Sequence, residues 1–149
     1  MTRAAHVAAL ALALALALAA GPAAAQEVVA HDFDGSFDDA TFAVETAIVG
    51  EGLVIDHVSH VGDMLARTGA DVGSAETVFT AADVFTFCSA VVSREVMEAD
   101  PMNIAYCPYG IFVAERDGAV TVGYRTYPDG PMDAVEELLA GIVRAALAD

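Results

Sequence analysis

The sequence predicts a single α+β domain, a two-layer sandwich in which a mixed or antiparallel sheet carries helices packed on one face. Three observations favour this class: strand and helix patterns alternate along most of the chain, a tight hairpin occurs late, and an amphipathic helix ends it. The 149 residues less a 25-residue export signal leave 124, which is enough for one hydrophobic core. We therefore expect one domain over residues 26–149.

The first 25 residues have the pattern of an export signal. Arg3 gives a positive start, and residues 7–20 form an Ala/Leu run that is shorter than the roughly 20 residues needed to cross a bilayer. Small residues precede Ala25, and the polar Gln26 follows it. We expect cleavage between Ala25 and Gln26 and a mature protein in the periplasm or outside the cell.

The mature sequence predicts nine elements in the order β-α-β-α-β-α-β-β-α. Ser36 is a good N-cap for the first helix, with Asp38 and Asp39 in its first turn. Asp117-Gly118 supplies the positive φ angles of a tight hairpin turn. The predicted strands cover residues 27–31, 53–58, 84–88, 111–115 and 120–125, with a further short strand at 77–80, and the predicted helices cover residues 37–49, 60–68, 90–99 and 133–147.

The mature chain is strongly acidic, with 22 acidic residues, five arginines and no lysine, a formal charge of -17. This charge makes phosphate backbones and anionic lipid heads poor partners, which excludes nucleic-acid binding. The acidity indicates either a solvated surface or attraction to a basic protein partner, such as a periplasmic electron carrier.

Cys88 and Cys107 are the two cysteines of the chain. An even pair in an oxidising compartment suggests a disulfide. Free thiols with a metal or redox role, and inert buried cysteines, are the alternatives. The chain has no Cys-x-x-Cys motif, which disfavours a thioredoxin-like function.

His57, His60 and Met64 are candidate metal or haem ligands. If a helix begins at Ser59, His60 and Met64 lie four residues apart on one face, an arrangement that suits a soft metal or a haem iron. The alternative is that methionines at helical spacing fill the core and that the histidine caps a helix. Further soft candidates are Met97, Met102 and Cys107.

The few arginines and a group of tyrosines are the remaining candidates for a ligand-binding site. Arginines at positions 67, 94 and 125 could bind an anion, or form exposed ion pairs. The four tyrosines could line a pocket or lie partly buried in the sheet; they are Tyr106, Tyr109, Tyr124 and Tyr127. The chain has no Gly-x-Ser-x-Gly, His-Glu-x-x-His, phosphate-loop or dinucleotide motif.

Several local strings occur in a characteristic order between Phe33 and Leu147. They are Gly52-Leu53-Val54-Ile55, the segment 56–60, Phe87-Cys88-Ser89, Met97-Glu98-Ala99-Asp100, the strand from Cys107-Pro108 to Glu115, and Tyr124 with Pro128. In these features the chain resembles the domain-of-unknown-function 302 family, small α+β domains of bacteria and archaea. The resemblance implies the fold but no established activity.

The resemblance also bears on single residues. Members tend to have a histidine near the end of the second strand, and His60 matches it better than His57. Ser89-Ala90 stands where the family often has Asn-Pro, and Cys107 precedes Pro108, whereas the family's second cysteine usually follows the proline.

We therefore expect an exported binding module that holds a metal, haem or another ligand near His60 and Cys88, or that docks a redox partner. A thiol- or His-dependent enzyme in periplasmic redox or sulfur chemistry is one alternative. A structural protein that forms a homodimer through a sheet edge or the helix layer is another.

Overall fold

A computed structural model describes residues 28–148. The predicted signal and its cleavage site, Ala25 and Gln26, lie outside the described residues. Within the described range the strands form one open sheet in the order β1-β5-β4-β3-β2, and every neighbouring pair is antiparallel. The strands are β1 (Val28–Phe33), β2 (Ile55–His60), β3 (Ala81–Phe87), β4 (Tyr109–Arg116) and β5 (Ala119–Arg125).

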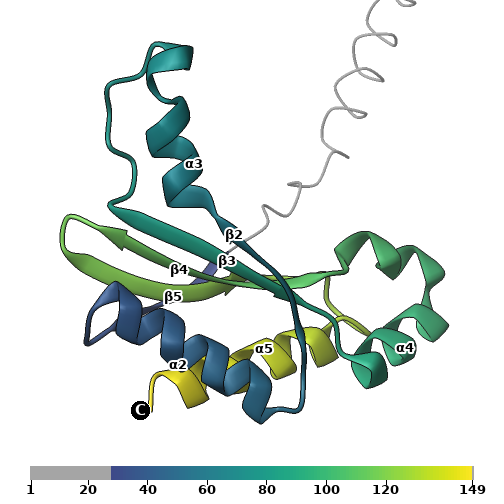
Figure 1. The fold of residues 1–149 in the computed structure, drawn as a ribbon. Coiled ribbons are helices and arrows are strands. Elements are labelled where there is room, and N and C mark those ends of the chain that lie inside the picture. Colours follow the sequence, from purple (N-terminus) through teal and green to yellow (C-terminus); the bar gives the residue numbers. More distant parts are fainter. Residues whose placement is uncertain (1–27, 149) are drawn as a thin grey trace, which may run out of the picture.

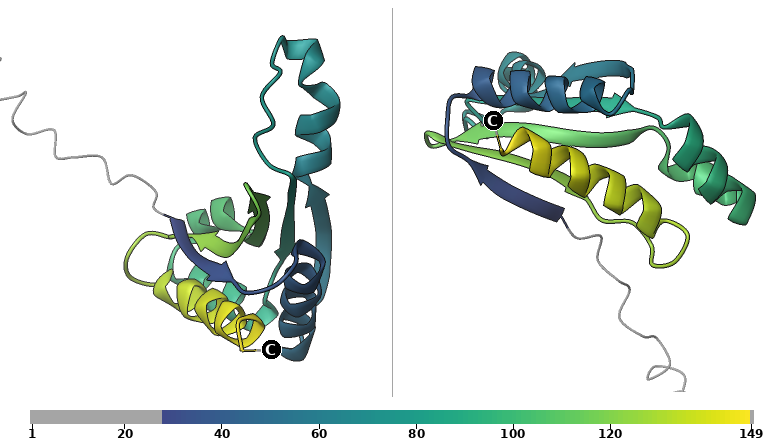
Figure 2. Two further views of the ribbon diagram at one scale, coloured as in Figure 1. Left: turned by 90° about the vertical axis from the view of Figure 1, so that its left-hand side faces the viewer. Right: turned by 90° about the horizontal axis from the view of Figure 1, so that it is seen from below.

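Two helices cover one face of this sheet. α2 (Phe37–Gly50) and α5 (Asp133–Ala146) pack against each other beneath the strands (Figures 1 and 2). α4 (Ala90–Ala99) and the 3₁₀ segment η2 (Pro101–Tyr106) lie at one end of the sheet (Figure 1). The predicted α+β class with helices on one face is therefore confirmed, and the sheet is antiparallel rather than mixed.

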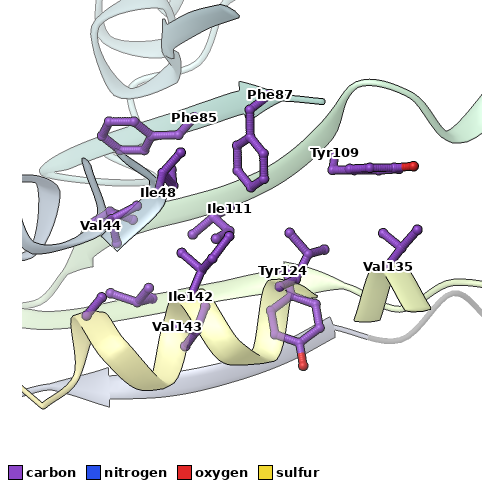
Figure 3. Close-up of a cluster of buried hydrophobic side chains, with 14 of the residues drawn as sticks. Val44, Ile48, Phe85, Phe87, Tyr109, Ile111, Tyr124, Val135, Ile142 and Val143 are labelled. Atoms are coloured by element: carbon purple, nitrogen blue, oxygen red, sulfur yellow. The ribbon is translucent and has the colours of Figure 1, made fainter. Parts of the chain in front are cut away.

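The core lies between the sheet and these two helices. Because side chains alternate along a strand, every second residue of β3, β4 and β5 points to the helices. Figure 3 shows this layer, in which Phe85, Phe87 and Ile111 face Val44, Ile48 and Ile142. In residues 28–148, no helix is both long and apolar enough to cross a membrane.

The sequence signals at the helix start and the hairpin are confirmed. Ser36 Oγ accepts a hydrogen bond from Asp39 N at 3.1 Å, and Asp39 Oδ2 accepts one from Ser36 N at 3.2 Å, forming a capping box. Asp117 and Gly118 join β4 to β5 with φ angles of 53° and 81°, as a type I′ turn requires.

Two local predictions are wrong, and one segment was not predicted. The second strand runs to His60, so Ser59 lies in the sheet and His60 takes the N-cap position of α3 (Val61–Thr68). Pairing with β3 through residue 60 outweighs the capping preference of Ser59. Residues 77–80 form no strand, and η2 was not expected.

Candidate functional site

His60 is hydrogen-bonded to a carboxylate of the neighbouring strand. It lies opposite Asp83 in the β2–β3 register, and its Nδ1 is 2.8 Å from Asp83 Oδ1. The histidine side chain is 61% exposed and that of Asp83 is 14% exposed, so the contact lies at the rim of the sheet. One ring nitrogen of His60 is therefore already engaged.

The other two ligand candidates near His60 have different surroundings. His57 lies three residues away on the same strand, and an odd separation along a strand places the two side chains on opposite faces. The sulfur of Met64 lies 3.8 Å from Thr68 Oγ1. Among residues 28–148, no group of three or more His, Cys, Asp or Glu side chains is arranged to hold a metal ion.

Cys88 and Cys107 meet at the far end of the sheet. Their sulfurs lie at disulfide distance and their Cα atoms are 6.6 Å apart, across 19 positions of sequence. Cys88 directly follows β3, and a cis peptide bond joins Cys107 to Pro108 just before β4. The sequence prediction of a bonded pair thus agrees with the positions of the two cysteines.

The histidine and cysteine candidates lie too far apart to share one metal ion. Asp83, the partner of His60, precedes Cys88 by five residues along β3, which is about 17 Å in an extended strand. The remaining soft candidates are also separate: Met97 packs against the core, and Met102 is exposed. The structure therefore does not bring the expected ligand set together.

A cluster formed by an arginine and three tyrosines lies next to Cys107. Arg125 Nη2 donates a hydrogen bond to the carbonyl of Tyr106 at 3.3 Å, and its Cζ lies 5.0 Å from the ring centre of Tyr127. Tyr127 contacts Tyr106 and Tyr109 edge-on, with ring centres 5.9 and 6.1 Å away. No carboxylate of the described residues forms an ion pair with Arg125, so outer donors of its guanidinium remain for an anion.

Two tyrosines of this cluster, Tyr109 and Tyr127, are buried and contribute to the packing of the domain. Burial raises the pKa of Tyr109 above its ordinary value of 10.0, although the hydrogen bond between Tyr109 Oη and Ser93 Oγ, 3.1 Å long, opposes this shift. The hydroxyl of Tyr127 is buried without a hydrogen-bond partner among the described residues. Tyr124 is not part of the cluster: it faces the core beside α5, and burial raises the pKa of its hydroxyl above 10.0.

The sheet face opposite α2 and α5 is a further candidate surface (Figure 1). We define the open face as the outward positions of the three middle strands, and we derive these positions from the strand register and the alternation of side chains. They are Ala82, Val84, Thr86, Gly110, Phe112, Ala114, Arg116, Ala119, Thr121, Gly123 and Arg125. None of these positions is a carboxylate, although the whole chain has 22 acidic residues. On the neighbouring edge strand β1, the exposed Asp32 lies opposite Thr121 and shares this face of the sheet.

Comparison with known proteins identifies the family of this chain. The model of the family described as "Domain of unknown function DUF302" matches residues 29–145. The chain belongs to the DUF302 family.

A solved DUF302 structure shares this fold. The crystal structure of an uncharacterized conserved DUF302 protein from Bacillus stearothermophilus matches with a TM-score of 0.58 and 16% sequence identity, and the match covers 81% of this chain and 93% of that one. No curated protein matches the chain significantly. The family assignment from the sequence is therefore confirmed, and it brings no activity with it.

Sequence reasoning missed the open face of this DUF302 domain. The sequence of the two hairpin strands contained a signal for this face, because the residues that alternate with the core positions carry no charge. They are Gly110, Phe112, Ala114, Thr121 and Gly123. In a solvated antiparallel sheet the outward positions are usually polar. The absence of acidic residues there, in so acidic a chain, could have marked this face.

Proposed function

We propose that this DUF302 protein is an exported binding module that docks a protein partner on its open face. The observation that carries the proposal is that the outward positions of β3, β4 and β5 carry no carboxylate, although the exposed Asp32 of the edge strand β1 lies beside them, opposite Thr121. Interface cores are depleted of charged residues, whereas an exposed sheet face of an acidic protein would be expected to carry its share of acids.

The shape of the open face supports close approach of a partner. Small residues on the open face, Gly110, Ala114 and Gly123, let a partner approach the backbone of the sheet closely. The larger residues between them, Val84 and Phe112, supply apolar contact area. The side chains of Val84, Phe112 and Ala114 are half-buried by their neighbours, which restricts their motion before a partner arrives. A surface that is ordered in advance loses less conformational entropy on binding.

Arg125 is suited to anchor such a partner at one end of the open face. Its guanidinium is positioned by the Tyr106 carbonyl and by the rings of Tyr106 and Tyr127, and no described carboxylate neutralises it. Arginine is enriched among the residues that dominate binding energy, and it can hold a carboxylate through two hydrogen bonds. We infer that an acidic group of the partner binds Arg125.

The arrangement of the cysteines favours binding over thiol catalysis. Two sulfurs at disulfide distance leave no thiolate to act as a nucleophile while the bond is intact. The engaged ring nitrogen of His60 likewise points to a structural contact with Asp83. Among residues 28–148, no three His, Cys, Asp or Glu side chains are placed to hold one metal ion.

Photo-cross-linking in intact cells tests the proposal. A photo-reactive amino acid is placed at position 121, at the centre of the open face, and at position 91, an exposed apolar residue of α4, as the control. We expect position 121 to give a discrete cross-linked species and position 91 to give none. Absence of cross-links from position 121, or the same products from both positions, would overturn the proposal.

A pair of charge reversals tests the role of Arg125. Arg125→Glu should abolish the product cross-linked from position 121. Arg94→Glu is the matched control, because Arg94 is an exposed residue of α4 that pairs with Glu98 in the same helix. Loss of the cross-linked product in both variants would show that any added negative charge prevents binding, and it would contradict a specific contact between Arg125 and the partner.

A further inference from the structure

We infer that the protein has a second binding site, a hollow on one flank of α5 that holds a small amino acid, a molecule with one ammonium and one carboxylate group. This site goes beyond the proposed docking surface, because it lies on the helix side of the sheet and not on the open face. The hollow has a volume of about 590 Å³, within the roughly 300–1,000 Å³ of small-molecule sites. Its lining residues are Tyr124, Glu136, Glu137, Ala140 and Arg144.

The periodicity of α5 places four of the lining residues on one flank of the helix. Positions 136, 137, 140 and 144 fall within an arc of about 100° around the helix axis. The buried residues of α5 occupy the neighbouring arc, which faces the sheet. The flank therefore borders the core at the point where Tyr124 of β5 reaches the surface of the hollow.

The hydroxyl of Tyr124 lacks a partner. The residue is 5% exposed, and Figure 3 shows its ring beside α5, with the hydroxyl pointing away from Phe87 and Ile111. This hydroxyl forms no hydrogen bond with any residue that the structure describes. A tyrosine as buried as this one usually finds a partner for its hydroxyl. A ligand in the hollow would supply that partner.

Charges of both signs act on this hydroxyl. Burial is the main reason why the pKa of Tyr124 lies above 10.0; the carboxylate of Glu136 raises this pKa further, and the guanidinium of Arg144 lowers it. The phenol is therefore protonated at neutral pH. It can donate a hydrogen bond to a carboxylate or accept one from an ammonium group.

Arg144 provides the group that would bind the carboxylate of the ligand. Its Nη2 lies 3.9 Å from the position of a Cβ atom at Gly141, so the guanidinium folds back along α5 by about one turn. It forms no ion pair with a carboxylate of residues 28–148, although the chain has 22 acidic residues and six basic ones. Its donors are therefore available for a carboxylate, which arginine binds through two parallel hydrogen bonds.

Two glutamates provide the groups that would bind the ammonium. Glu136 Oε1 accepts a hydrogen bond from Tyr127 N, which holds this side chain in place. Glu137 is exposed and has no partner among residues 28–148. Arg144 follows Glu137 by seven residues, about 10 Å along the helix axis. The opposite charges thus stand at the two ends of the hollow without pairing directly.

This arrangement of charges favours an amino acid over a simple ion. An anion alone would bind Arg144 but would be repelled by the two glutamates, and a cation alone would be repelled by Arg144. A molecule with both groups can place its carboxylate at Arg144 and its ammonium at Glu136 and Glu137. The Tyr124 hydroxyl between them then donates a hydrogen bond to the carboxylate.

A titration of the mature, oxidised protein followed by nuclear magnetic resonance tests this inference. We expect L-alanine or 4-aminobutyrate to bind saturably with a Kd of about 1 mM or below and to shift the amide signal of Gly141. The matched single-charge compounds are propionate and ethylamine for L-alanine, and butyrate and propylamine for 4-aminobutyrate. Each should bind at least about tenfold more weakly than its parent amino acid. Equal binding of a single-charge compound, or no binding of either amino acid, would overturn the inference.

Three substitutions locate the site. Arg144→Gln and Tyr124→Phe should each weaken binding of the amino acid at least about tenfold, because each removes a hydrogen-bond donor to the carboxylate. Arg94→Gln is the matched control, since Arg94 is an exposed arginine of α4. Unchanged circular dichroism shows that a variant is folded; Arg144 is exposed, so its variant decides the matter if Tyr124→Phe does not fold. Binding that survives Arg144→Gln, or that Arg94→Gln weakens equally, would overturn the inference.

Discussion

The ring of Phe112 lies across Gly123 on the neighbouring strand. The two residues are opposite each other in the β4–β5 register, and a Cβ atom at position 123 would come within 2.7 Å of Phe112 Cζ and would also meet the carbonyl of Val29. The aromatic ring thus occupies the space that a side chain at position 123 would fill. Because the Phe112 ring lies over Gly123, the centre of the open face is apolar and has no side chain projecting from position 123.

Gly123→Ala should destabilise the domain, because the new methyl group has to displace backbone of β1 as well as the Phe112 ring. Overpacking of this kind costs about 1–3 kcal/mol, measured by urea unfolding. Gly141→Ala in α5 is the matched control, because a Cβ atom there meets nothing closer than 3.9 Å. That control should stabilise the protein by about 0.5–1 kcal/mol. Equal effects of both substitutions would contradict the packing described here.

Loss of the disulfide should lower the free energy of unfolding. The loop between Cys88 and Cys107 spans 19 positions, for which the chain-entropy model gives about 3 kcal/mol. The Cys88→Ser/Cys107→Ser variant, compared with the oxidised protein in urea, measures this difference. Adding reductant should destabilise the wild type by a similar amount and leave the variant unchanged; reductant-insensitive stability of the wild type would show that the two sulfurs are not bonded.

The capping box of α2 should make stability depend on pH in the acid range. Hydrogen bonds from Ser36 lower the pKa of Asp39 below its ordinary value of 3.8. A carboxyl group with a lowered folded pKa contributes stability above its unfolded pKa, and this contribution is lost as the pH falls through the folded value. Asp39→Asn should therefore narrow the difference in unfolding free energy between about pH 7 and about pH 2.

Two variants calibrate this acid-range measurement. Asp38→Asn removes an acid of the same helical turn that lies outside the capping box, and it should preserve more of the pH dependence. Ser36→Ala removes the hydroxyl and should cost about 1 kcal/mol at neutral pH. If Asp38→Asn and Asp39→Asn behave alike, the capping box is not the source of the effect.

Tyr109 and Tyr124 should titrate late in alkali. Burial raises the pKa of both hydroxyls above 10.0, so their folded forms favour the neutral phenol. Their contribution to stability is present below pH 10.0 and is lost as the pH rises through the raised folded values. The phenolate absorbance of Tyr109→Phe should lack one late-titrating group. If the substitution instead removes an early step, the buried environment of Tyr109 is contradicted.

The sequence predicted the elements because their signals are local. The capping box at Ser36 and the turn at Asp117-Gly118 are read from a few neighbouring residues, and both occur as expected. The late amphipathic helix was predicted from its period and packs on the core. The boundary near Ser59 was misplaced because pairing with β3, a contact between distant segments, decides where β2 ends.

The candidate site was harder to predict because it depends on register. His60 and Cys88 looked like parts of one site in sequence, but the pairing of His60 with Asp83 places them at opposite ends of β3. The contact between Arg125 and the carbonyl of Tyr106 spans 19 positions and has no local signature. The open face becomes visible only when the strands are aligned side by side.

Radical footprinting of the protein in intact cells tests the central claim most directly, because it reports whether the open face is covered. Met102 is 70% exposed and Met132 is 2% exposed, so the two provide reference rates for free and buried methionines. We predict that Phe112, at the centre of the open face, reacts more slowly in cells than in dilute purified protein, while Met102 reacts equally in both. Equal reactivity of Phe112 in cells and in dilute purified protein would contradict docking at this face.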